Sequence, residues 1–369
     1  MSTSTKPVEV VIACHTPDRP VGRAVASVLH GNEDVADVLV VCHNRSADEI
    51  AGAIAPEDRD RVRFLEHRDE HRSASGPFNA GLVDGDSPFV AIMGSDDTLA
   101  PGAVASWLAI RRSTGADFVI TRLALGAAGN GVPTPAVRMR RAGRCDLVRD
   151  RLSYRSAPLG LIDREALRRS GLRLVEGAVV GGDVEMVTRM MHEWPVAYDR
   201  FGPPYVIGED ASDRVTYVVR PMDVQLGFVP PMLEADWFRR APLAARRAVV
   251  VKFLRIHVFG AVFYRQPEDI WTPQEREALA RMTRCLLEAA EGAQAPLSRA
   301  DRDLLDACLD PAVPAADLAA LAVARRRHGR PSTVLTRELR HMLDREAPLR
   351  FMLASLAVAR LPRLLRSRR

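Results

Sequence analysis

The sequence predicts an α/β fold, with a mostly parallel sheet flanked by helices and an all-helical carboxyl-terminal extension. Over about the first ninety residues, short β-branched apolar runs alternate with helical patterns, an order typical of open parallel sheets. Polar residues follow several of these runs, at the sheet edge where such folds bind ligands. After about Met222 the pattern becomes almost entirely helical. We therefore expect two domains, residues 1–222 and 223–369.

The elements are expected in the following order. Strands are predicted at residues 8–13, 35–42, 62–65 and 89–94. Helices between them are predicted at residues 21–29 and 47–54, with a third ending at 79–83. Beyond the fourth strand we expect a helix at 103–114, a strand at 117–123, a Gly- and Pro-rich loop at 126–135, a helix at 164–170 ended by Gly171, and an amphipathic helix at 183–192. In the later region, residues 271–275 and 298–301 have the pattern of helix starts.

The composition is that of a soluble globular protein. The 369 residues are 47% hydrophobic and 27% charged, and the net charge of +5 does not by itself demand a nucleic-acid partner. Five widely spaced cysteines without a Cys-x-x-Cys pair indicate a reducing compartment. We expect a cytoplasmic protein, since no secretory signal is visible and the most apolar later stretch, residues 248–263, is too short and too charged to span a bilayer. The Ala- and Arg-heavy composition fits a GC-rich bacterial source.

The most informative stretch is the apolar run at residues 89–94, which ends on Ser95, Asp96 and Asp97. Two adjacent acids at the end of a buried strand require a cation or strong hydrogen-bond donors. Mg²⁺ and similar ions accept one or two carboxylates, with substrate phosphates completing the shell. The alternative is an exposed turn that caps the helix after Pro101.

Four motifs stand in a characteristic order: an opening strand and loop at residues 10–20, Asn79-Ala80-Gly81-Leu82, the acidic strand end at residues 88–103, and Gly182-Asp183-Val184-Glu185-Met186 followed by Arg189. Over residues 8–220 the chain resembles the family 2 glycosyltransferases, which have the GT-A fold. The resemblance implies transfer of a sugar from a nucleoside-diphosphate sugar to a hydroxyl acceptor. The acceptor expected from the family is a cell-envelope glycan or a lipid-linked precursor.

The resemblance also implies roles for individual residues. A divalent cation, Mg²⁺ or Mn²⁺, is expected on Asp96 and Asp97, where it neutralises the leaving diphosphate. Asp183 is expected to be the base of an inverting single displacement, and a helix amino end favours its ionised form. The alternative for Asp183 is a helix cap without a catalytic role. Residues expected to bind the donor are Ala13, His15, Arg19, Asn44, Asn79, Ser95 and Asp96. For His15, Arg19 and Asn44 the alternative is an ordinary polar loop residue.

Several positions depart from the family pattern. Cys42-His43-Asn44 stands where the family has an acidic pair that reads the nucleobase, which leaves the base open. Gly94 replaces the first acid of the metal motif, Gly182 replaces a Glu, and Phe78 replaces an Arg. These changes keep two alternatives open: a catalytically silent nucleotide-sugar-binding scaffold, and a related nucleotidyl or glycerophosphate transferase.

Further groups have secondary roles in the prediction. Cys14-His15 and Cys42-His43 suggest zinc, but adjacent residues on a strand point to opposite faces, so the four ligands should not converge. Glu209, Asp210 and Arg214 follow a late strand and are secondary donor contacts by analogy. The arginine-rich cluster at residues 138–144 is either an anion contact or plain surface charge. Residues 349–369 combine apolar bulk with arginine, which suits either an interfacial helix on anionic lipid at the inner face of the membrane or a packed last helix.

Overall fold

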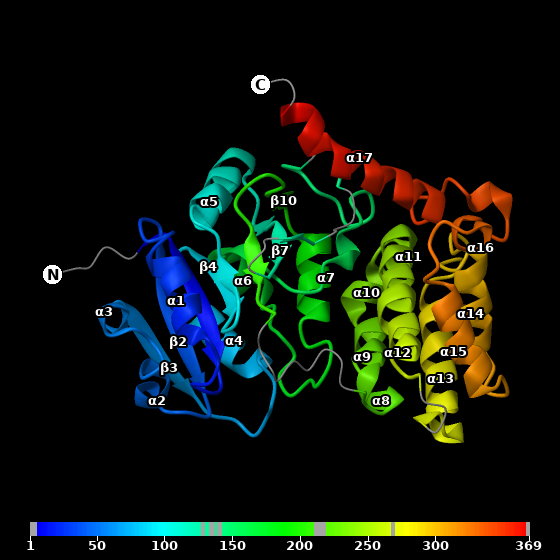
Figure 1. Cartoon of the computed structure of the whole chain (residues 1–369), viewed down its shortest axis with the longest axis horizontal. Helices are drawn as coiled ribbons and strands as arrows, with labels where there is room; N and C mark the ends of the chain where they lie inside the picture. Colours follow the sequence, from blue (N-terminus) through cyan, green and yellow to red (C-terminus); the bar gives the residue numbers. More distant parts are fainter. Residues whose placement is uncertain are drawn as a thin grey trace. The chain divides into compact units, whose positions relative to one another are not determined.

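The structure is a computed structural model that describes residues 6–126, 130–132, 137–138, 142–209, 219–266 and 270–366 (Figure 1). Contacts divide the chain into two compact units. The first unit contains Met1–Pro133, Arg140–Asp146 and Arg155–Arg214. The second contains Thr134–Met139, Leu147–Tyr154 and Val215–Arg369. The second unit therefore draws two short segments from the earlier part of the chain.

The first unit is built on a seven-stranded sheet in the order β10-β6-β9-β4-β1-β2-β3. Its strands are β1 (Val8–Cys14), β2 (Ala36–His43), β3 (Val62–His67), β4 (Phe89–Gly94), β6 (Phe118–Ile120), β9 (Gly160–Asp163) and β10 (Val196–Tyr198). Neighbouring strands are parallel except at β9, which runs antiparallel to both β4 and β6. The predicted mostly parallel sheet is confirmed.

Helices cover both faces of this sheet (Figure 1). Val10 and Ile12 share a buried cluster with Val25 of α1 and Trp107 of α5. The alternate residue Val11 faces α4, where Gly81 lets the helix approach so closely that a Cβ there would lie 2.3 Å from Val11 Cγ1. The period of two along the strand thus divides its apolar residues between two helix layers. The helices of this unit are α1 (Val21–Leu29), α2 (Ala47–Ala51), α3 (Pro56–Arg59), α4 (Ser75–Val83), α5 (Ala103–Thr114), α6 (Arg164–Ser170) and α7 (Val184–Glu193).

A second, four-stranded sheet has the order β5-β11-β7-β8. Its strands are β5 (Thr98–Leu99), β7 (Leu123–Leu125), β8 (Asn130–Gly131) and β11 (Tyr205–Ile207). The single strand predicted at residues 117–123 is wrong, because the chain leaves the main sheet after Ile120 and enters the second sheet at Leu123. The backbone N–H of Thr121 donates to the Leu159 carbonyl at this crossing. Of the predicted loop at 126–135, residues 127–129 and 133–135 lie outside the described residues, and residues 130–131 form β8.

The helix predicted at residues 47–54 is shorter than expected. Ser46 and Glu49 form a capping box at its start, in which each side chain accepts from the backbone N–H of the other residue. The helix ends at Ala51, before Gly52, and α3 begins at Pro56. Glycine is a poor helix former and proline suits a first helical turn, so both features fit the local sequence.

The second unit is helical, as predicted. It contains η1 (Leu152–Tyr154), α8 (Met222–Gln225), α9 (Val229–Glu234), α10 (Asp236–Arg240), α11 (Leu243–Lys252), the π-helix η3 (Phe253–Val258), α12 (Phe259–Phe263), α13 (Pro273–Ala289), α14 (Arg299–Leu309), α15 (Ala315–Ala324), α16 (Pro331–Val334), η5 (Leu339–His341) and α17 (Pro348–Arg366). Both predicted helix starts are confirmed, since Thr272 and Ser298 accept the backbone N–H three residues later. Within the described part of the chain, no helix combines the length and apolarity needed to cross a bilayer.

A buried polar cluster holds the second unit together. Arg255, on the π-helix, donates to the Tyr154 hydroxyl at 2.9 Å and to the Glu346 carbonyl at 2.8 Å. Tyr154 in turn donates to Glu346 Oε2 at 3.0 Å. The Nε atom of Arg255 lies 3.6 Å from Asp301 Oδ2. Burying these charges is costly unless they are paired, so the cluster ties η1, η3, α14 and the segment before α17 to one another.

Candidate active site

Parallel register brings the carboxyl ends of four strands to one rim. Ala13 of β1 pairs with Gly94 of β4, and Cys14 of β1 pairs with Cys42 of β2. His43 of β2 pairs with His67 of β3. The segments predicted to lie along a common rim, those following β1, β2 and β4, therefore do so. Of the predicted donor contacts in this rim, His15 is exposed, Ala13 is half-buried and Ser95 is buried.

The Asp97 carboxylate is fixed by the second sheet. Its Oδ2 accepts a hydrogen bond from the Tyr205 hydroxyl at 2.5 Å, and its Oδ1 accepts from the Gly208 backbone N–H at 2.8 Å. Tyr205 also accepts from the Gly94 N–H at 3.0 Å, so one buried hydroxyl joins both ends of the acidic turn. Burial, followed by the Asp97 charge, raises the pKa of Tyr205 well above 10, which keeps it a hydrogen-bond donor.

The Asp96 carboxylate is held differently. Its Oδ1 lies 3.0 Å from an Arg19 guanidinium nitrogen, and its backbone carbonyl accepts from Arg23 at 2.8 Å. Arg19 was predicted as a donor contact, and the structure places it on the predicted cation ligand. The pair is half-buried, with side-chain exposures of 16% and 15%.

The carboxylate oxygens at this turn fit a divalent cation whose other ligands come mostly from substrate and water. Asp96 offers a hard oxygen ligand, and a single carboxylate with phosphates is an ordinary Mg²⁺ site. Among the residues the structure describes, no group of three or more His, Cys, Asp or Glu side chains could hold a metal without such help. The binding of a cation by Asp96 and Asp97 remains a prediction. Both Asp97 carboxylate oxygens already accept hydrogen bonds from the protein.

Two glycines give the acidic turn its space, and one of them, Gly94, is a departure from the family pattern. A Cβ on Gly94 would lie 2.6 Å from Asp97 Oδ2, so an acid at this position would crowd the existing carboxylates. A Cβ on Gly208 would lie 2.0 Å from the Asp96 carbonyl oxygen. The tight turn at Asp96 and Asp97 therefore depends on the absence of side chains at two positions, the end of β4 and the residue after β11.

Sequence reasoning did not single out Tyr205 or Arg23. Both act on the acidic turn from elsewhere in the chain, Tyr205 from 108 residues beyond Asp97 and Arg23 from 73 residues before Asp96. No local spacing joins residues so far apart. The sequence contains one indication for Tyr205. It is a polar residue in the apolar run before Gly208 and Glu209, a segment already predicted to lie near the sugar donor. Asp210 and Arg214, the other secondary candidates there, lie outside the described residues.

At the ends of β2 and β3, Asp69 is clamped between two histidines. Its two oxygens lie 2.8 Å from His43 Nε2 and 3.0 Å from His67 Nε2. Although burial acts to raise it, these hydrogen bonds hold the pKa of Asp69 well below its usual range. Asn44, a predicted donor contact, adopts the left-handed conformation (φ 56°), and its side-chain oxygen accepts the Asp69 N–H at 3.0 Å. The second strand therefore lacks the acidic pair of the family pattern, but an acid from the loop after β3 lies beside its end.

The two cysteines of this rim are buried in the sheet. Burial raises the pKa of both thiols, that of Cys42 to about 12. Cys14 also donates to the Thr16 carbonyl at 3.2 Å and shares a hydrogen bond with Ser95. His43 is already engaged by Asp69. The cysteines are packing residues of the sheet.

Asp183 immediately precedes α7, as predicted. Its backbone carbonyl accepts from Val187, but its side chain makes no hydrogen bond to the amino end of the helix. The capping alternative would use the carboxylate for that purpose. Asp183 is half-buried, and its role as a base stays a prediction.

Asn79, a predicted donor contact, is buried, with 3% of its surface exposed. Its side chain makes three hydrogen bonds to residues 174–176, described in detail below. A hollow of about 560 Å³ runs beside Asn79 along α4, with Arg168 and Arg173 among its lining residues. None of its described lining residues comes from the Asp96 turn.

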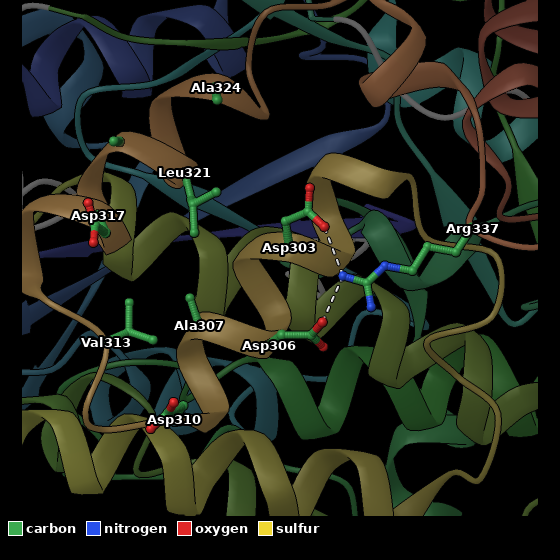
Figure 2. Close-up of a pocket in the computed structure, with 10 residues that line it drawn as sticks. Asp303, Asp306, Ala307, Asp310, Val313, Asp317, Leu321, Ala324 and Arg337 are labelled. Atoms are coloured by element: carbon green, nitrogen blue, oxygen red, sulfur yellow. Dashed lines mark hydrogen bonds and ion pairs between the residues drawn. The ribbon is translucent and has the colours of Figure 1, made fainter.

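A larger hollow of about 730 Å³ lies in the second unit, on α14 and α15 (Figure 2). Four aspartates line it, and Arg337 bridges two of them, Asp303 and Asp306, at 2.8 and 2.7 Å. Arg337 is the single cation among the described lining residues. An acidic hollow whose cation is already paired repels phosphate, so it is unsuited to a nucleotide.

Comparison with known proteins agrees with the architecture. No protein-family model matches the chain, and no curated protein matches it in sequence. Among solved structures, S. aureus TarS residues 1–349 in complex with UDP-GlcNAc superposes with a TM-score of 0.68 at 15% identity, over 88% of this chain and 92% of that one. The complex of the same fragment with UDP gives 0.65 at 16% identity, with the same coverage. The longer S. aureus TarS structure gives 0.65 at 15% identity, over 88% of this chain and 56% of that one. The chain therefore shares the fold of S. aureus TarS over 88% of its length.

Proposed function

We propose that this protein is a glycosyltransferase that moves a sugar from a nucleoside-diphosphate sugar to a hydroxyl group. The proposal rests on the acidic turn, in which Asp96 lies beside Arg19 and Asp97 is fixed by Tyr205 and Gly208. This turn lies at the rim where parallel sheets bind ligands. The fold shared with S. aureus TarS, whose structures hold UDP-GlcNAc and UDP, supports a nucleotide-sugar donor.

The proposed chemistry is an inverting single displacement. The acceptor oxygen forms a bond to the anomeric carbon while Asp183 takes its proton, and the bond to the diphosphate breaks with its electron pair on the leaving oxygen. A cation bound by Asp96, with Asp97 beside it, would neutralise the charge that gathers on the diphosphate. Arg19 and Arg23 hold the Asp96 side chain and backbone, so this carboxylate needs little reorganisation during the reaction.

The experiment combines donor binding and turnover. Thermal-shift screening against nucleoside diphosphates and their sugars, with and without Mn²⁺, should identify one stabilising nucleotide whose effect increases with the metal. Asp183→Asn should abolish transfer while sparing that stabilisation, whereas Asp96→Asn should weaken it. Full transfer activity in Asp183→Asn would refute the base, and binding without any metal dependence would refute the cation.

The alternative of a silent binder or scaffold has a specific observation in its favour. Cys42-His43-Asn44 stands where the family pattern has an acidic pair after the second strand, and His43 is hydrogen-bonded to Asp69. A scaffold would bind a nucleotide sugar and never release free sugar. Slow metal-dependent donor hydrolysis, followed by chromatography of the products, separates the two.

We also propose that α17 contacts an anionic membrane surface. Phe351 packs on Tyr154 with ring centroids 5.6 Å apart, which turns this side of the helix inward. The opposite side leaves Leu353 and Leu356 more than half exposed. Residues 347–369 contain six arginines and no acid. Apolar side chains beside cationic ones suit the headgroup region of anionic lipid.

This contact predicts binding to vesicles containing phosphatidylglycerol and not to neutral phosphatidylcholine vesicles. A Leu353→Glu, Leu356→Glu double variant should reduce co-sedimentation at least tenfold without changing the melting temperature. Equal binding by this variant would refute the lipid contact, and a shift in the protein's own sedimentation on mutation would point to a second copy as the occupant.

A further inference from the structure

The side chain of Asn79 links helix α4 to a distant segment. Its Nδ2 donates to the Leu174 carbonyl at 2.8 Å and to Glu176 Oε1 at 2.8 Å, and its Oδ1 accepts the Leu174 N–H at 2.9 Å. An amide side chain offers two donors, and both are used here. The linked residues are 95 and 97 positions apart in sequence. The site is buried, so these bonds cannot be replaced by water at low cost.

The segment that Asn79 holds leads directly to Asp183. Val175 donates its N–H to the Gly182 carbonyl at 2.8 Å, which closes residues 175–182 into a loop. Gly177 and Gly181 have φ of 74° and 75°, a conformation that glycine adopts without strain. The residue after this closed loop is Asp183, whose carbonyl accepts the first helical N–H of α7, from Val187.

The far end of the loop also rests on α4. A Cβ on Gly182 would lie 2.6 Å from the Ser75 hydroxyl oxygen and 3.0 Å from the Val175 carbonyl oxygen. The loop is therefore fixed to one helix at both ends, by hydrogen bonds at Asn79 and by close packing at Ser75. The Glu that the family has before its catalytic Asp would not fit here, which explains Gly182.

We propose that Asn79 is a positioning residue that places Asp183 by holding the 174–182 loop, and that it does not itself bind the donor. The inference rests on the proposed function for its catalytic consequence, but not for the loop itself. The hydrogen bonds of the side chain connect to Asp183 through the backbone of this loop, so the effect proposed for transfer is one of geometry. A displacement of about 1 Å at a reacting group costs about 100-fold in rate.

The test uses Asn79→Asp, which keeps the shape and can still accept from Leu174 but cannot donate to Leu174 or Glu176. Amide hydrogen exchange of residues 175–183 should accelerate at least tenfold, while exchange in β1 and β4 stays unchanged. Transfer kcat should fall about 100-fold, and the donor Kd should stay within threefold. A donor-binding residue would give the reverse, a raised Kd with kcat retained, and that result would overturn the proposal.

Asn32→Asp is the matched control. Asn32 is also buried and makes three hydrogen bonds of the same type, to the carbonyls of Ser27 and Ala100 and from the N–H of Val104. Its replacement should destabilise the first unit without accelerating exchange at 175–183. Acceleration at 175–183 in both variants would mean general loosening and would refute the specific link. The exchange measurement decides the loop's dependence on Asn79 even if no sugar transfer is ever detected, so it separates this proposal from the proposed function.

Discussion

Replacing Tyr205 by Phe removes one buried oxygen and leaves two partners unsatisfied. The hydroxyl donates to the Asp97 carboxylate and accepts from the Gly94 N–H, and only 1% of the residue is exposed. A hydrogen bond to a charged group contributes about 1.5–3 kcal/mol and a neutral one about 0.5–1.5 kcal/mol. We expect the first unit to lose about 2–4 kcal/mol of unfolding free energy, which lowers its melting temperature by about 5–15 °C for a unit of about 200 residues.

Calorimetry of the full chain measures this loss, with Tyr264→Phe as the control because Tyr264 is 48% exposed. The pH dependence adds a second readout. Because the folded pKa of Tyr205 is raised, its contribution to stability is complete below pH 10 and is lost as the pH rises above it, by up to about 1.4 kcal/mol per pH unit. This part of the alkaline loss should be missing in Tyr205→Phe. A melting temperature within 1 °C of wild type, or an unchanged alkaline slope, would refute the role given to this hydroxyl.

Three further predictions concern other parts of the chain. Gly208→Ala forces a methyl group against the Asp96 carbonyl, and we expect a loss of about 1–3 kcal/mol in thermal unfolding together with reduced sugar transfer; a neutral result would show that the turn can relax. Burial, followed by a neighbouring lysine, holds the pKa of His257 well below 6.5. The stability of the second unit should therefore fall as the pH drops below 6.5, and it should fall less in His257→Gln. Urea unfolding at pH 5 and 7.5 measures the difference. Burial raises the pKa of the Cys42 and Cys308 thiols to about 12. Both should resist iodoacetamide at pH 8 in the folded protein and react on unfolding, as measured by mass spectrometry. Rapid labelling of either thiol would contradict their burial.

Much of the fold was predictable because the signal is local. The strands at β1 and β4 and the helices α1 and α5 follow from apolar spacing within each segment, and all four were placed within a residue of their observed ends. The crossing between the two sheets near Thr121 was missed. The polar pair Thr121-Arg122 interrupts the apolar residues there, but such a break does not reveal a change in partner strand, which depends on β11 more than eighty residues later.

The site was predictable in its carboxylates and less so in what holds them. Asp96 and Asp97 stand out because two acids end a buried strand, and the structure gives both specific partners. The support from Tyr205 and the use of Asn79 as a link to another loop could not be predicted, since each depends on a contact across about a hundred residues. A motif match assigns a polar residue such as Asn79 to ligand binding, whereas in this structure its side chain hydrogen-bonds to the protein backbone.

The Arg255 cluster of the second unit has a consequence for the order in which the chain folds during synthesis. Tyr154 and Glu346 hydrogen-bond across 192 residues, so the early segment at 147–154 has no complete partner until residue 346 has been made. Until then Arg255 and Tyr154 lack a carboxylate they need for burial. The first unit, whose last segment ends at Arg214, can finish earlier. A translation product that stops before Glu346 should therefore carry a structured α/β part and a loosely packed helical part that chaperones and proteases recognise.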